Sequence, residues 1–302
     1  SRRILKFLRD LKFEQFRDVI SQANGNQAIK DQLWVFKPDI LEGHIEFFWR
    51  ISRKVQIVDN SWLKARLQLP GGVGFEGGQG VLLDEDYGFY PHVTWSRTGF
   101  TNALELLAGY TGKIVRLGLL RAYATRHGKG PMVTEETSLD AYLPEPDNPS
   151  GQFTGAFRVG YLDLVALRYA LDVTGGADFL AVSHLDLLAH VPQWNICEAY
   201  CCDHPEAPEF FEMRGNLATR IKKVDPGNLA TREHLTQLLF RCQPVYRTIV
   251  KTHEKDYLVH IEESLGVPIA IAGQGRTDRD REFLRPILPE VTMASPAMEF
   301  GR

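Results

Sequence analysis

Apolar residues along this chain follow two patterns, helical spacing and short continuous runs. Over residues 1–69 they recur at intervals of three and four, which predicts helices. Glycine then dominates, with six glycines in residues 71–80. We predict a short buried strand at 73–75 and a loop at 76–80, because glycine favours turns and close backbone approach.

The rest of the chain alternates predicted strands with predicted helices. Apolar runs predict strands at 114–124, 179–183, 195–201 and 267–272, and helical spacing predicts helices at 100–112, 163–173, 231–241 and 250–265. Proline and glycine make 138–158 a loop, and a polar segment extends from 202 to about residue 230. The alternation predicts an α/β fold. We expect one large domain over residues 1–302, with a mostly parallel central sheet flanked by helices.

Ligands of such sheets bind beyond the carboxyl ends of the strands. The loops at 76–80, 125–130, 183–186 and 273–276 follow predicted strands. We therefore expect these four loops to lie along one edge of the sheet and to carry the chemistry.

Composition excludes several classes of protein. The 302 residues are 44% hydrophobic and 24% charged, as in ordinary soluble proteins, and the net charge of -3 provides no basic field for nucleic acid. Neither a membrane-spanning apolar run nor a signal-peptide pattern is present. The four cysteines form neither a disulfide scaffold nor a CxxC pair, which suits a reducing compartment. We expect a cytoplasmic protein that binds neither nucleic acid nor membrane.

Polar residues near the glycine-rich segment are the first candidates for binding. Gln79 follows two glycines, and its amide offers both a donor and an acceptor to the edge of a purine. The alternative is a tight turn without a ligand. Thr94 is suited to hydrogen-bond a phosphate, or else to form a cap or turn. Asp84 and Asp86 fit a solvated loop better than a metal site.

Three further segments carry candidate chemistry. Residues 125–130 combine cations with glycine in a way that suits phosphate, although no P-loop pattern occurs in the chain. A lone histidine such as His127 in that segment is more often a structural residue than a catalytic one. Arg158 ends a loop and is able to close over a carboxylate or triphosphate, or to pair with a local acid. Asp186 follows a strand and is able to accept from guanine or to cap the next helix.

Taken in order, these segments resemble the adenylosuccinate synthetase family. Residues 75–84 and 90–94 are similar to its FEGAQGxLLD and YPxVT motifs, and residues 125–135 are similar to TRVGxGPFPTE. Later stretches are similar to TGWLDxVAxR, TKLDxL, CxAY and the start of the final strand, at residues 159–168, 182–188, 197–200 and 266–269. The order and spacing hold over roughly residues 70–280.

The resemblance implies a carbon–nitrogen ligase of purine nucleotide biosynthesis. Such an enzyme joins L-aspartate to C6 of a 6-oxopurine nucleotide, here IMP or GMP/dGMP. The donor, ATP or GTP with Mg²⁺, would transfer its γ-phosphoryl group to O6, and the aspartate amine would then displace phosphate.

The resemblance also implies binding residues for the substrates. Gln79 corresponds to the contact with the purine 6-oxo group, Thr94 to the 5′-phosphate contact, and His127 to a position beside the base. Thr154 and Arg158 lie in the loop that resembles the one recognising aspartate.

Two other groups of residues follow from the same resemblance. The positions that hold the donor's base correspond to His184, Asp186, Gly273 and Gly275. Arg2 lies in a segment similar to ARRG, whose arginine reaches the substrate phosphate of the neighbouring subunit. A homodimer is therefore implied.

Departures from the family pattern leave some questions open. The WGDEGKGK loop and the catalytic His of the family are missing from these 302 residues, so no catalytic residue and no metal ligand is assigned. We expect the sequence to be a piece of a longer chain. The alternative is a catalytically inactive purine-nucleotide-binding paralogue that acts as a regulatory or assembly subunit.

Two positions that correspond to the donor's base also depart from the family. His184 replaces the family's usual Lys, and Gly273 replaces a Ser that contacts guanine. These changes weaken the case for GTP as the donor and leave ATP open. His127 replaces a small apolar residue near the substrate base, and the arginine cluster of the family is reduced to Arg158. Together these changes resemble the viral branch of the family, which uses dGMP to make a 2-amino-adenylosuccinate nucleotide.

Overall fold

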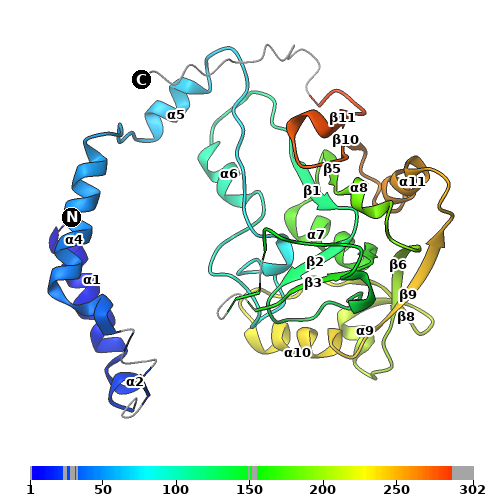
Figure 1. The fold of residues 1–302 in the computed structure, drawn as a ribbon, viewed down its shortest axis with the longest axis horizontal. Helices are drawn as coiled ribbons and strands as arrows, with labels where there is room; N and C mark the ends of the chain where they lie inside the picture. Colours follow the sequence, from blue (N-terminus) through cyan, green and yellow to red (C-terminus); the bar gives the residue numbers. More distant parts are fainter. Residues whose placement is uncertain are drawn as a thin grey trace. The chain divides into compact units, whose positions relative to one another are not determined.

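The computed structural model describes residues 2–22, 26–27, 31, 33–148, 150–151 and 155–287 (Figure 1). Its contacts divide the chain into two units, Ser1–Leu69 and Pro70–Arg302. We describe each unit by itself. No helix among the described residues is long and apolar enough to cross a membrane.

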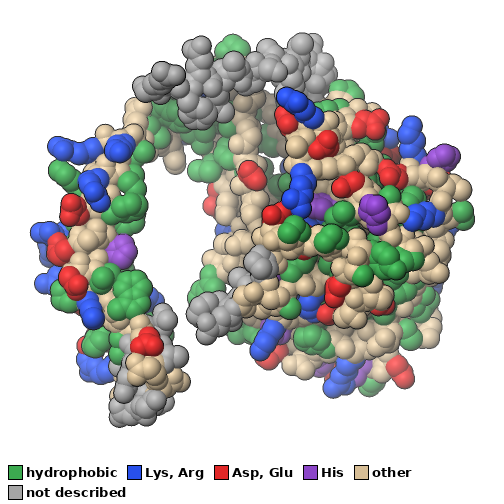
Figure 2. All heavy atoms as spheres, viewed as in Figure 1, with side chains coloured by type: hydrophobic (Ala, Val, Ile, Leu, Met, Phe, Trp, Pro, Cys, Tyr) green, Lys and Arg blue, Asp and Glu red, His purple; other side chains and the backbone are tan. Residues whose placement is uncertain are grey.

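The first unit is helical, as its apolar spacing predicts. Its described elements are α1 (Arg2–Gln15), α2 (Arg17–Gln22), η1 (Leu33–Phe36), α4 (Pro38–Ser52) and α5 (Asn60–Arg66). Pro38 begins α4, where a missing N–H costs nothing, and Asp59 caps α5 by accepting from the Ser61 N–H at 2.9 Å. None of α1, α4 and α5 has a buried residue, and the helices expose apolar side chains (Figure 2).

The second unit is built on a four-stranded sheet in the order β1-β5-β10-β11. The strands are β1 (Leu117–Arg121), β5 (Phe179–Ser183), β10 (Ile269–Gly273) and β11 (Arg281–Phe283). The first three are parallel, and only the edge strand β11 is antiparallel among them. The predicted α/β fold with a mostly parallel central sheet is confirmed.

Two smaller sheets complete this unit. The hairpin-like pair consists of β2 (Ala124–His127) and β3 (Phe157–Gly160). The other sheet contains β4 (Leu162–Asp163), β6 (Trp194–Cys201), β7 (Phe211–Arg214), β8 (Leu217–Ile221) and β9 (Gln243–Ile249). Its pairs are antiparallel except for β4 with β6.

Helices cover these sheets. They are η2 (Val81–Leu83), α6 (Thr101–Leu106), η3 (Thr137–Leu139), α7 (Leu164–Thr174), α8 (Leu185–Leu188), α9 (Ala207–Phe210), α10 (Leu229–Leu239), α11 (Glu254–Leu265) and η4 (Asp278–Asp280). Within the unit, α10 lies at the end away from β10 and β11 (Figure 1). Asp163 caps α7 by accepting from the Ala166 N–H at 3.0 Å, and Gly175 ends the helix in a left-handed conformation. This helix matches its prediction.

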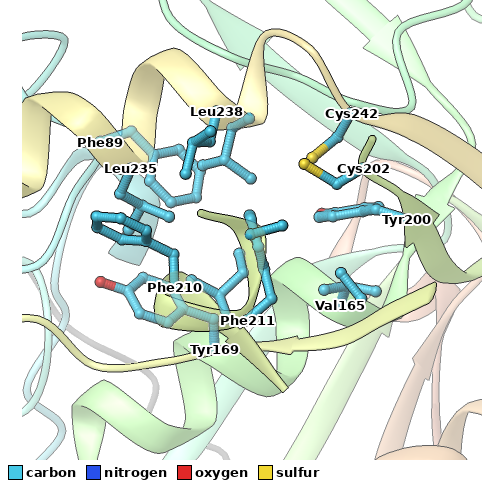
Figure 3. Packing of buried hydrophobic residues seen from close by; sticks show 14 of the residues in the cluster. Phe89, Val165, Tyr169, Tyr200, Cys202, Phe210, Phe211, Leu235, Leu238 and Cys242 are labelled. Carbon is cyan, nitrogen blue, oxygen red and sulfur yellow. The ribbon is translucent and has the colours of Figure 1, made fainter. Parts of the chain in front are cut away.

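Two main apolar clusters hold the unit together. One joins α7 and α10 to β6 and β8, and includes Tyr169, Tyr200, Phe211 and Leu238 (Figure 3). The other packs α11 against β5 and β10, with Leu180, Val182, Ile261 and Ile269. The loops that follow β5 and β10 are therefore anchored by a well-packed core.

Several predicted elements were wrong. Residues 73–75 form no strand, and Val73 and Phe75 are 43% and 39% exposed, because no described strand pairs with them. The predicted loop at 125–130 begins as strand β2, which pairs with β3. The polar segment after residue 202 contains β7 and β8, and β9 precedes α11. These short strands depend on pairing with β6 and with each other, which local periodicity does not reveal.

Candidate functional site

The glycine-rich loop places Gln79 at the surface in a left-handed backbone conformation, with φ of 64°. Its Oε1 accepts from the Ser96 hydroxyl at 3.4 Å. A side chain in this conformation is uncommon outside turns and is found often at ligand sites. The Gln79 amide is held weakly and remains accessible to a ligand.

Asp84 organises the loop that follows. One carboxylate oxygen accepts from the backbone N–H groups of Asp86 and Tyr87, and the other accepts from Thr98 N–H at 2.7 Å. The Thr98 hydroxyl also donates to the Gly80 carbonyl at 3.0 Å. Asp84 is buried and its oxygens are engaged, so it shapes the loop rather than binding a cation.

Thr94 is fixed by its backbone, since its N–H donates to the Leu83 carbonyl at 2.7 Å. Its half-buried side chain has no hydrogen-bond partner in the part of the chain that the structure describes. Two residues earlier, His92 sits among cations. Burial is the main cause that lowers the pKa of His92, and the positive charges of Arg126, Lys129 and Arg158 lower it further. Three positive charges therefore act on the loop that carries Thr94, at His92.

Two arginines hold the loop at residues 128–130 by hydrogen bonds to its carbonyls. Arg126 and Arg158 face each other across β2 and β3. Arg126 Nε donates to the Lys129 carbonyl at 3.0 Å. Arg158 donates to the carbonyls of Gly128, at 3.1 and 2.9 Å, and of Gly130, at 2.7 Å. A Cβ at residue 130 would overlap the Arg126 guanidinium, so only glycine fits.

Arg158 also forms an ion pair with Glu135, at 2.6 Å. Each nitrogen of its guanidinium therefore has an acceptor within the protein, and one Nη1–H has no acceptor among the described residues. Arg158 lies in β3 rather than in a free loop. A carboxylate would bind Arg158 through that N–H or by replacing Glu135.

His127 ends β2 and packs edge-on against Phe157, with the ring centroids 5.6 Å apart. Its Nε2 is buried and has no hydrogen-bond partner among the described residues. An unpartnered buried nitrogen is costly, which is consistent with a partner supplied by a ligand. This observation gives His127 more weight than its sequence context did.

The candidate residues for the donor's base gather where β5 and β10 end. His184 follows β5 with φ of 62°, and its Nδ1 lies 2.9 Å from the Ser183 hydroxyl. Burial is the main cause that lowers its pKa, and Arg121 is the second. Gly273 ends β10, where a Cβ would lie 3.3 Å from Ser183 Cα, so glycine permits the close approach of the two strands.

Asp186 and Gly275 lie in the same two loops. Asp186 is in the first turn of α8 and is close enough to His184 to act on its pKa. Gly275 lies beside Asp280 in the loop after β10. Because β5 and β10 are adjacent and parallel, both loops leave the same edge of the sheet.

A row of side chains connects this edge to the loop at 128–130. Tyr123 meets His184 edge-on at 5.8 Å, and Arg121 lies over the Phe157 ring at 5.5 Å. Phe157 in turn contacts His127. The structure thus brings His127, Arg158 and His184 into one continuous region. The described contacts join Thr94 to it through His92, but none joins Gln79 to His184 or Gly273.

The remaining predicted residues lie elsewhere. Arg2 begins α1 in the first unit, is exposed, and pairs with Glu42 of α4. Thr154 lies outside the described residues. No role for either residue is tested by the fold.

Sequence reasoning missed two buried arginines, Arg126 and Arg232. Arg126 donates to the His92 carbonyl at 2.8 Å, and Arg232 of α10 donates to the Glu85 carbonyl at 2.7 Å. The mixture of cations and glycine at 125–130 was a signal for the first. Nothing in the local sequence marks the second, because its partner is 147 residues away.

The described residues contain no group of three or more His, Cys, Asp or Glu side chains able to hold a metal ion. Positive and negative side chains are interspersed over the face of the second unit that Figure 2 shows.

The parallel sheet and the cationic loops gathered beside it define an α/β protein with a site suited to an anionic ligand. The family model described as Adenylosuccinate synthetase matches residues 3–282, and the chain belongs to the adenylosuccinate synthetase family.

Comparisons with individual proteins agree with this assignment. The chain is similar to the Adenylosuccinate synthetase of Malacoplasma penetrans, with 40% identity over 70% of this chain and 48% of that protein. It is 32% identical to the Adenylosuccinate synthetase of Chlorobaculum parvum, over 88% of this chain and 60% of that one. The chain thus spans about half to three-fifths of the length of these relatives.

A solved structure supports the fold. The fully ligated Adenylosuccinate synthetase from Plasmodium falciparum superposes with a TM-score of 0.65 at 22% identity, covering 90% of this chain and 64% of that one. At this identity the likeness concerns the architecture alone.

Proposed function

We propose that the protein is a carbon–nitrogen ligase that joins L-aspartate to C6 of a 6-oxopurine nucleotide, IMP or GMP/dGMP, with hydrolysis of ATP or GTP. The observation that carries the proposal is the family match over residues 3–282, which includes every candidate binding residue except Arg2. The relatives named above are adenylosuccinate synthetases, and the cationic loops beside Thr94 suit a phosphorylated substrate.

The substrate nucleotide is assigned to the loops around Gln79, Thr94 and His127. Gln79 presents an accessible amide that is able to hydrogen-bond the 6-oxo group. The Thr94 hydroxyl, which has no hydrogen-bond partner among the described residues, is assigned to the 5′-phosphate. The buried Nε2 of His127, which likewise has no described partner, is assigned to a polar group on the base. The 2-amino group of GMP or dGMP would donate a hydrogen bond to that nitrogen.

Aspartate and the donor are assigned to the other residues. Arg158, with Thr154, recognises an aspartate carboxylate by exchanging its bond to Glu135. His184, Asp186, Gly273 and Gly275 hold the base of the donor at the edge of the central sheet. Arg2 reaches the substrate phosphate of a second subunit in a homodimer.

The chemistry proceeds in two steps. The γ-phosphoryl group of the donor moves to O6, and the nucleoside diphosphate leaves. The aspartate amine then attacks C6, the C6–O6 bond breaks, and inorganic phosphate departs with O6 and the bonding electrons. Phosphorylation turns a poor leaving group into a good one, and nearby cations stabilise the charge that develops.

Magnesium would accompany the triphosphate. Mg²⁺ in such sites keeps several waters and is held largely by phosphate oxygens with one or two carboxylates. The described residues do not form a ligand set of their own, and Asp84 is already engaged by N–H groups. No step is assigned to a metal held by this part of the protein.

Release of inorganic phosphate by the full-length natural protein tests the proposal. The reaction contains Mg²⁺, a donor, aspartate and one 6-oxopurine nucleotide. We expect release that requires both aspartate and the nucleotide. Nucleotide binding without release under any pairing would indicate the inactive purine-binding paralogue instead.

A further inference from the structure

Arg126 is a buried cation that has no acidic partner in the part of the chain that the structure describes. Its side chain is 6% exposed, and no carboxylate among the described residues forms an ion pair with it. Two backbone carbonyls accept from its Nε and Nη2, and Nη1 has no described partner. Burial lowers the pKa of Arg126 to about 10, with a further contribution from Arg158, so the group stays charged at neutral pH. A buried charge of this kind is costly unless something compensates it.

The two carbonyls belong to different loops. His92 lies two residues before Thr94, and Lys129 lies two residues after His127. The guanidinium therefore sets the distance between the loop that carries Thr94 and the loop that follows His127. Its rigid fork fixes two directions at once, which a lysine ammonium does less well.

Positive charge exceeds negative charge around this junction. Arg126, Lys129 and Arg158 all act on His92, and among the described residues only Arg158 has a carboxylate partner, Glu135. Lys129 is exposed and forms no ion pair among the described residues. No described carboxylate pairs with Arg126 or Lys129, so their charges are available to attract an anion bound at Thr94.

Arg232 provides an internal comparison. It is 3% exposed, also lacks a carboxylate partner among the described residues, and donates to the carbonyls of Glu85 and Gly88 at 2.7 and 3.4 Å. It holds the earlier part of the same loop, lies over the Tyr90 ring at 5.5 Å, and makes no described contact with residues 128–130. A loss of general loop order should therefore follow from changing either arginine, whereas a loss of phosphate recognition should follow only from changing Arg126.

We propose that Arg126 is a positioning residue that holds Thr94 in register with His127 and whose charge selects the phosphorylated substrate over its nucleoside. The proposal rests on the nucleotide-binding function proposed above. A purely structural arginine would alter affinity for nucleotide and nucleoside equally, whereas a charge-selecting one alters their ratio.

The test combines titration calorimetry with amide hydrogen exchange on the full-length protein. Wild type, Arg126→Gln, Arg126→Lys and the control Arg232→Lys are titrated with IMP, GMP and dGMP and with inosine, guanosine and deoxyguanosine. We expect Arg126→Gln to weaken nucleotide binding at least tenfold and nucleoside binding less than threefold. Arg126→Lys should keep the preference for the nucleotide, because it keeps the charge, and Arg232→Lys should also keep it.

Amide hydrogen exchange in the absence of ligand tests the positioning role separately. Amides of residues 90–94 should exchange faster in both Arg126 variants, because neither replacement donates to both loops. An equal loss for nucleotide and nucleoside in Arg126→Gln, or unchanged exchange at 90–94, would overturn the proposal. If Arg126→Gln does not fold, the exchange result for Arg126→Lys decides. A wild type that binds none of the three nucleotides would instead overturn the proposed function.

Discussion

Arg126 and Arg158 are directly opposed in the antiparallel pair of β2 and β3, although both carry a positive charge. Like charges in this arrangement normally destabilise a sheet. Here the carbonyls of residues 128–130 accept from both guanidiniums, and Glu135 pairs with Arg158. The two guanidiniums thus hold the short loop at residues 128–130 and place two positive charges beside the candidate site.

Replacing Arg158 with Ala should impair the use of aspartate and triphosphate far more than the use of the purine nucleotide. We expect the KM for aspartate to rise at least tenfold, because a charge-assisted hydrogen bond to a carboxylate is lost. Stability should fall by about 1–3 kcal/mol, since the carbonyls at 128 and 130 lose their donors.

Steady-state kinetics with each substrate varied in turn measures this effect. Glu135→Gln is the matched control, because it removes the ion pair and leaves the bonds from Arg158 to the carbonyls. Its KM values should stay within about threefold of wild type. Equal losses for all three substrates in Arg158→Ala would exclude the assigned role.

Replacing Gln79 with Ala should weaken binding of the purine nucleotide about three- to tenfold, the worth of one hydrogen bond between neutral groups. Ser96→Ala removes only the 3.4 Å contact to Gln79 and should have a smaller effect. Titration calorimetry with the nucleotide compares the two variants. Unchanged affinity in Gln79→Ala would show that this amide does not contact the base.

Replacing Gly130 with Ala should destabilise the second unit by about 2–4 kcal/mol, because the residue has φ of 115° and a Cβ would overlap Arg126. The control is Gly227→Ala, whose Cβ would meet nothing closer than 3.4 Å and whose backbone has no positive φ. Urea unfolding should separate the two variants. Equal stability of Gly130→Ala and wild type would contradict the observed packing of Arg126.

Asp163 should make stability depend on pH. The carboxyl is buried and accepts from the Tyr200 hydroxyl at 2.6 Å, and burial raises its pKa to about 6. The folded state therefore binds this proton more tightly than the unfolded state, whose Asp pKa is near 4. The stability that this group contributes is present below about pH 4 and is lost as the pH rises to about 6.

Asp163→Asn removes the titration and still caps α7. Relative to wild type, this variant should gain about 2 kcal/mol of stability between pH 4.5 and pH 7.5. Urea unfolding at both values measures the change. A constant difference between variant and wild type at the two pH values would show that Asp163 does not titrate in this range.

Those parts of the fold that local pattern controls were predicted from the sequence. The strand β5 and the helix α7 have strong apolar periodicity, and α7 also has a cap at Asp163 and a glycine at its end. The strands β7, β8 and β9 were missed because they are stabilised by their pairing in one sheet. A strand at 73–75 was predicted from apolar residues that have no partner strand among the described residues.

The candidate site shows the same division. Motifs marked Gln79, Thr94, His127 and His184 as candidates, because each lies in or at the end of a segment with a distinct glycine or polar pattern. Arg126 and Arg232 act through carbonyls 34 and 147 residues away, so burial and contacts were needed to recognise them. The unpartnered Nε2 of His127 likewise became visible only in three dimensions.

The fate of the purine O6 shows directly whether the protein joins aspartate to C6 through a 6-phosphoryl intermediate. The full-length protein is incubated with ¹⁵N-aspartate, Mg²⁺, ATP or GTP, and IMP, GMP or dGMP labelled with ¹⁸O at the 6-position, and products are read by mass spectrometry. We expect a succinyl-purine nucleotide that carries ¹⁵N and inorganic phosphate that carries the ¹⁸O, and the productive pair identifies both substrates. The absence of both labelled products from every combination would contradict the ligase assignment.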